Sequence, residues 1–99
     1  MEIEIINGKE TIVKIMGRVD TATASTFDQE IAGLINTDNK VVFDCEELEY
    51  IASAGLRVLL NAYKSLQHAG GSMALINVKP AVMDVLNMTG FSLFMTVNE

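Results

Sequence analysis

The chain has 99 residues, of which 49% are hydrophobic and 20% are charged, and this supplies the core of one domain over residues 1–99. Seven Lys and Arg against 13 Asp and Glu give a net charge of −6, which argues against nucleic acid or an anionic membrane surface as a partner. No stretch approaches the roughly 20 apolar residues of a membrane-spanning helix, and the single cysteine cannot form an internal disulfide, so we expect a cytoplasmic protein without membrane insertion.

The N-terminal residues have the pattern of a β-hairpin. Glu2–Ile6 alternates Glu with Ile, and Asn7-Gly8 indicates a tight turn. Thr11–Met16 is rich in β-branched residues and predicts the second strand. We expect the segment Gly17-Arg18-Val19-Asp20 to end that strand.

A first helix is predicted over residues 22–36. Its apolar positions recur at the spacing of one helix face, and they are Phe27, Ile31, Leu34 and Ile35. Three residues before it have side chains that can cap a helix, namely Asp20, Thr21 and Thr23. The polar segment 36–39 is expected to separate this helix from the next strand.

The middle of the chain predicts a buried strand and a second helix. Lys40–Asp44 is apolar without alternation, which is typical of a central strand covered on both faces. Cys45–Ile51 is predicted to be a loop with apolar anchors at Leu48 and Ile51. A helix is then expected from about Ser53 to residue 69, and the glycine pair 70–71 should stop it.

The C-terminal third predicts a strand, a helix and a final strand. Ser72–Val78 is the strand, Pro80 suits the first turn of a helix that Gly90 should end, and Leu93–Val97 is the last strand. The order β-β-α-β-α-β-α-β predicts an α/β fold, in which helices pack on a mixed sheet of four or five strands. Lys40–Asp44 is expected at the centre of that sheet.

The chain lacks the residues of the common catalytic and metal sites. One His and one Cys cannot build a His-rich or Cys-rich metal site, and no phosphate-binding loop or nucleophile elbow is present. His68 is best interpreted as a solvated cation in the last turn of its helix, and Cys45 as a small core residue. We therefore expect neither an enzyme nor a cofactor.

The most informative stretch is the start of the second predicted helix, Ser53-Ala54-Gly55. Small residues let a partner approach the backbone closely, and the first N–H groups of a helix are free to receive an anion. A hydroxyl at this place is suited to carry a phosphate. Physical chemistry alone favours the simpler role of a helix cap, and the two roles are compatible.

Several segments in this order resemble the STAS domain, and most closely that of the bacterial anti-sigma factor antagonists. They are the hairpin, the turn at Gly17–Asp20, the strand Val41–Asp44, the helix start Ile51–Leu56, the Gly70-Gly71 pair and the helix from Pro80 to Phe91. The resemblance extends over essentially the whole chain. It implies the α/β fold predicted above, as a single STAS-like domain.

The resemblance also implies a function. Antagonists of this family bind an anti-sigma factor that is also a serine kinase, and this binding frees a sigma factor. The kinase phosphorylates a residue that matches Ser53, a phosphatase removes the phosphate, and a turn acid that matches Asp20 lies near it. The implied partner-binding residues are Asp20, Thr21, Ala52, Ser53, Ala54, Gly55 and Arg57.

Two positions depart from the family pattern. Ala52 stands where the family has an acid, and Ala54 stands where it has a second hydroxyl. This departure favours an alternative, a STAS subunit that docks on the ATPase of an ABC-type lipid transporter without a phosphate switch. We expect a monomer or a weak dimer in either case. Near Ser53, an acidic rim is predicted from Asp20, Asp44, Glu46, Glu47 and Glu49.

Overall fold

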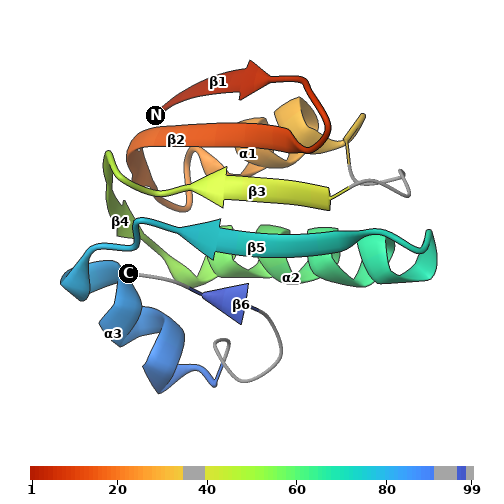
Figure 1. Ribbon diagram of the computed structural model, residues 1–99. Helices are drawn as coiled ribbons and strands as arrows, with labels where there is room; N and C mark the ends of the chain where they lie inside the picture. Colours follow the sequence, from red (N-terminus) through yellow and green to blue (C-terminus); the bar gives the residue numbers. More distant parts are fainter. Residues whose placement is uncertain (35–39, 91–95, 98–99) are drawn as a thin grey trace.

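The computed structural model describes residues 1–34, 40–90 and 96–97. It shows one mixed sheet (Figure 1) whose strands follow the order β1 (Glu2–Ile6), β2 (Thr11–Val19), β3 (Lys40–Asp44), β5 (Ser72–Ile76) and β6 (Thr96–Val97). Strand β1 is antiparallel to β2, and the other neighbours along this path are parallel. The predicted α/β class and the central position of Lys40–Asp44 are confirmed.

In the described part of the chain, three helices connect the parallel strands, and they are α1 (Ala24–Ile31), α2 (Ser53–His68) and α3 (Pro80–Met88). Helices α1 and α2 lie side by side behind the sheet in Figure 1 and contact each other. Helix α1 is shorter at both ends than the predicted 22–36, because residues 32–34 form a turn, and residues 35–36 lie outside the described residues. The predicted limits of α2 and α3 are correct to within one or two residues.

The segment Cys45–Ile51 is not the predicted loop, because Leu48–Ile51 forms strand β4, which pairs in parallel with the end of β2. Its anchors Leu48 and Ile51 are buried as expected, but two exposed residues separate them. This spacing lacks the alternation of a half-buried strand, so the sequence pattern does not predict strand β4. The pairing requires β2 to be longer than predicted.

Strand β2 continues past the predicted Met16 and ends at Val19, inside the segment that was expected to end it. Its register against β4 shifts between Gly17 and Arg18, and Gly17 has a φ of 88°, a backbone conformation that favours glycine. The N–H of Gly17 donates to the carbonyl of Glu47 at 2.9 Å. Gly17 therefore lies inside the strand, at the point where Glu49 of β4 is the extra residue between Leu48 and Tyr50.

The connection between β1 and β2 is longer than the predicted tight turn at Asn7-Gly8. Ile6 pairs with Ile12, and residues 7–10 belong to neither strand. A connection of this length is also common in hairpins, so the two strands still pair as expected.

The core lies between the sheet and helices α1 and α2. Val41 and Phe43 of β3 belong to this core, and Val42 between them is buried as well, as expected for a central strand. The rings of Phe27 and Phe43 meet edge to face, with centroids 6.2 Å apart. Cys45 is buried too, and desolvation raises the pKa of its thiol to about 12, so it is a core residue as predicted.

Candidate functional site at the start of helix α2

Two chain segments leave the sheet next to each other, one towards α1 and one towards α2. Val19 and Ile51 are register partners at the ends of β2 and β4, and the N–H of Ala52 donates to the carbonyl of Val19 at 2.8 Å. Asp20 follows Val19, and Ser53 follows Ala52. The tertiary structure therefore brings the Asp20 turn and the start of α2 to the same edge of the sheet.

The turn before α1 is held by reciprocal hydrogen bonds between Asp20 and Thr23. The N–H of Thr23 donates to Oδ1 of Asp20 at 3.0 Å, and the N–H of Asp20 donates to Oγ1 of Thr23 at 2.9 Å. The N–H of Thr23 is the main reason that the pKa of Asp20 lies below its usual value. Of the three candidate caps, Thr21 is exposed, and the other two form this pair.

The start of α2 has no side-chain hydrogen bond of this kind. The residue before the helix is Ala52, which is extended and has no side chain that could accept a hydrogen bond, and the first turn contains no acid. Ser53 is the first helical residue and is exposed, and within the described parts of the chain its hydroxyl has no hydrogen-bond partner. The interpretation of Ser53 as a cap is therefore wrong, and the hydroxyl stays accessible.

Gly55 has a role inside the protein that the sequence did not indicate. It is buried, and a Cβ atom at this position would lie 2.8 Å from Cγ1 of Ile51 and 2.8 Å from Cγ1 of Val19. The first turn of α2 can therefore lie directly on the ends of β2 and β4. The small residue that was expected to admit a partner here admits the protein's own strands, whereas Ser53 and Arg57 face solvent.

Sequence reasoning missed a contact between Arg18 and Tyr50 beside this edge. The two residues are register partners on β2 and β4, and the Arg18 guanidinium carbon lies 4.5 Å from the centre of the Tyr50 ring. Both side chains are exposed. No signal for this pair existed in the sequence, because β4 itself was not predicted.

Two of the five acids in the predicted rim, Asp20 and Asp44, are hydrogen-bonded within the protein. Oδ1 of Asp44 accepts hydrogen bonds from the N–H of Glu46 and from Nδ2 of Asn77, both at 3.1 Å, so this carboxylate joins the loops after β3 and β5. Glu46, Glu47 and Glu49 are exposed. Asp20 is hydrogen-bonded to Thr23. Both aspartates therefore have a structural role, and each stabilises a turn or loop of the protein itself.

In the part of the chain that the structure describes, no group of three or more His, Cys, Asp or Glu side chains could hold a metal ion. None of the helices described has the length and apolar character of a membrane span.

The sequence model of the STAS domain matches residues 1–99. The chain is 37% identical to the anti-sigma factor antagonist BtrV of Bordetella bronchiseptica, over 89% of this chain and 78% of that protein. It is 30% identical to an anti-sigma F factor antagonist of Paenibacillus polymyxa, over 89% of this chain and 77% of that protein.

Solved structures have the same fold. An anti-sigma factor antagonist from Mycobacterium paratuberculosis has a TM-score of 0.88 at 21% identity, over 98% of this chain and 84% of that one. Unphosphorylated SpoIIAA, also an anti-sigma factor antagonist, has a TM-score of 0.80 at 18% identity, over 97% of this chain and 87% of that one. Anti-sigma factor antagonists are regulators rather than enzymes, which agrees with the prediction from the sequence. The chain is therefore a STAS domain and belongs to the anti-sigma factor antagonist family.

Proposed function

We propose that this protein is a cytoplasmic antagonist that binds an anti-sigma factor with serine kinase activity and thereby releases a sigma factor. Phosphorylation of Ser53 by that kinase ends the binding, and a phosphatase restores it. The observation that carries the proposal is the accessible Ser53 hydroxyl at the first residue of a helix whose start has no acidic side chain. SpoIIAA, which has the same fold, has been solved in a phosphorylated form, and this supports the proposal.

The phosphorylation reaction requires no catalytic group from the antagonist itself. The Ser53 oxygen attacks the γ-phosphorus of ATP, the bond to the β-phosphate oxygen breaks, ADP leaves, and the serine proton passes to a base of the kinase. The kinase supplies ATP and Mg²⁺, so the antagonist has only to present an accessible hydroxyl. The phosphate then lies at the positive end of α2, where free N–H groups favour an anion.

A second candidate function is favoured by the departure from the family pattern at two positions. Ala52 stands in place of an acid, and Ala54 stands in place of a residue with a hydroxyl. In this alternative the domain docks on the ATPase of an ABC-type lipid transporter and is never phosphorylated. A pull-down from the source cell with identification of the bound protein separates the two. A kinase-type anti-sigma factor supports the switch, and an ABC ATPase supports the transporter subunit.

The direct test is to incubate the protein with that anti-sigma factor, ATP and Mg²⁺, and to locate the phosphate by peptide mass spectrometry. We expect it on Ser53, and we expect no incorporation in Ser53→Ala. Ser25 is a matched control, because it is an exposed serine in the first turn of α1, and Ser25→Ala should be labelled like the unmodified protein. Phosphate found only at another residue would reject the assignment.

A further inference from the structure

The solvent-exposed face of α2 continues from Ser53 along the whole helix. With about 3.6 residues per turn, positions separated by four, seven, eleven and fourteen residues share one face. On α2 these positions are Ser53, Arg57, Leu60, Lys64 and Gln67, which we call the α2 stripe. Leu60 is half-buried and the other four are exposed. The proposed phosphorylation site is thus one end of a longer surface.

The α2 stripe is positively charged in an acidic protein. Helix α2 contains Arg57 and Lys64 and no Asp or Glu, whereas the whole chain has a net charge of −6. Neither cation has an ion-pair partner among the described residues, where the ion pair found is that of Lys40 with Glu10. Both charges are therefore available to an acidic partner.

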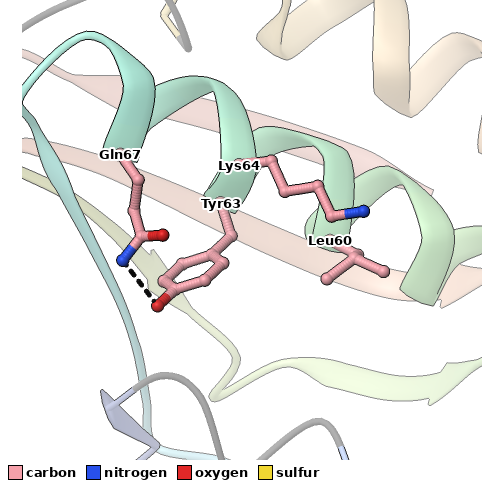
Figure 2. A pocket seen from close by; sticks show the side chains of 4 residues that line it. All are labelled: Leu60, Tyr63, Lys64 and Gln67. Carbon is pink, nitrogen blue, oxygen red and sulfur yellow. Dashed lines mark hydrogen bonds between the residues drawn. The ribbon is translucent and has the colours of Figure 1, made fainter.

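The second half of the stripe borders an open groove of about 450 Å³, lined by Leu60, Tyr63, Lys64 and Gln67. Figure 2 shows the Lys64 side chain extending along the helix towards Leu60, while Tyr63 and Gln67 lean towards each other. Nε2 of Gln67 donates to the Tyr63 hydroxyl at 2.7 Å, which fixes the ring as one wall. The groove thus offers an apolar surface from Leu60 and Tyr63 directly beside a cation.

We infer that the α2 stripe docks an acidic segment of the anti-sigma factor, with one apolar side chain in the groove and carboxylates on Arg57 and Lys64. The inference rests on the proposed function, and it names the surface and the chemistry of the partner. Charge complementarity selects this occupant, because Arg57 and Lys64 attract carboxylates, whereas the net charge of −6 repels an acidic segment from the protein as a whole. The apolar contact then holds the segment in one register.

The same arrangement explains how a phosphate on Ser53 would end binding. Arg57 lies one helical turn after Ser53, where side chains four residues apart are neighbours. A phosphoserine carries a charge of about −1.5 to −2 at pH 7 and forms strong hydrogen bonds with arginine. The phosphate therefore neutralises Arg57 and repels the incoming carboxylates at the same time.

The test is the affinity of the purified anti-sigma factor for charge-reversal variants, measured by calorimetry. Arg57→Glu and Lys64→Glu should each weaken binding by at least about tenfold, because each removes an attraction and adds a repulsion. Lys9→Glu is the matched control, because it makes the same change of charge in the exposed connection between β1 and β2 and should bind like the unmodified protein. Leu60→Ser should weaken binding without a charge change.

Melting temperatures of all variants show whether a loss of affinity reflects unfolding. If Arg57→Glu and Lys64→Glu bind as tightly as Lys9→Glu, the docking inference is overturned while the proposed function stands. If the unmodified protein does not bind the anti-sigma factor at all, the proposed function fails and the inference fails with it.

Discussion

Helices α1 and α2 begin at adjacent points of the sheet edge, but the segments that lead into them differ. The turn into α1 is closed by Asp20 and Thr23, whose side chains accept hydrogen bonds from each other's N–H groups. The start of α2 has Ala52 at the cap position, no acid in its first turn and the exposed Ser53. A carboxylate is hydrogen-bonded in the turn that leads into α1, whereas the segment that leads into α2 carries no such group.

This difference separates a structural helix start from a functional one. An uncapped helix end is less stable by roughly 0.5–2 kcal/mol than one with a good cap. At α2 this loss is compensated by the close packing of Gly55 on Val19 and Ile51, which fixes the helix without the use of its N–H groups. The position of α2 is therefore held from the core side, and its solvent side stays free for a partner.

The largest expected effect comes from loss of that packing. Gly55→Ala introduces a Cβ atom 2.8 Å from two buried side chains, and we expect a loss of about 1–3 kcal/mol in the free energy of unfolding. Gly33→Ala is the matched control, because a Cβ atom there meets no atom within 4 Å and should not destabilise the protein. Denaturant unfolding of both variants gives the comparison. Equal stability would mean that packing does not hold the start of α2.

The next effect concerns binding rather than folding. Phosphorylation of Ser53 should weaken the complex with the anti-sigma factor by roughly 5- to 150-fold, a typical coupling of about 1–3 kcal/mol. The melting temperature should not fall, because the helix end favours the added negative charge. Calorimetry on the unmodified protein, the phosphoprotein and Ser53→Asp measures both quantities. Equal or tighter binding by the phosphoprotein would reverse the sign of the proposed switch.

A smaller effect is expected if the start of α2 is given a side chain that can cap it. Ala52→Asp supplies a side chain that can accept a hydrogen bond from the first turn, and we expect the protein to gain about 1 kcal/mol in stability. Ala52→Asn is the control for charge, because it caps in the same way and carries none. Thermal unfolding measures both. If neither variant is stabilised, the first N–H groups of α2 do not lack hydrogen-bond partners, contrary to the structure.

The smallest effect is a pH dependence at the start of α1. The folded-state pKa of Asp20 lies below its usual 3.8, so its ionised form contributes stability above that pH. This contribution is lost as the pH falls through the lowered folded-state pKa. Below pH 3.8, the melting temperature of the unmodified protein should therefore fall more steeply than that of Asp20→Asn, which cannot titrate. If the melting temperatures of the two proteins fall in parallel as the pH decreases, the Asp20 carboxylate does not stabilise the turn.

The sequence by itself predicted the elements whose signals are local. The unbroken apolar run at Lys40–Asp44 indicated a central strand, and the apolar spacing of α2 with Ser53 at its start indicated a helix that presents a hydroxyl. These predictions held because propensity and hydrophobic period are properties of neighbouring residues. The family pattern then pointed to Ser53 and Asp20 as a pair.

Only the tertiary structure decided what lies between those elements. Strand β4 exists because β2 is long enough to pair with it, and that pairing sets Val19 beside Ile51 and brings Asp20 to the edge where α2 begins. Strand pairing joins residues far apart in the chain, so no local pattern around Leu48 could reveal it. The internal role of Gly55 arises for the same reason, since Val19, against which it packs, is distant in the chain.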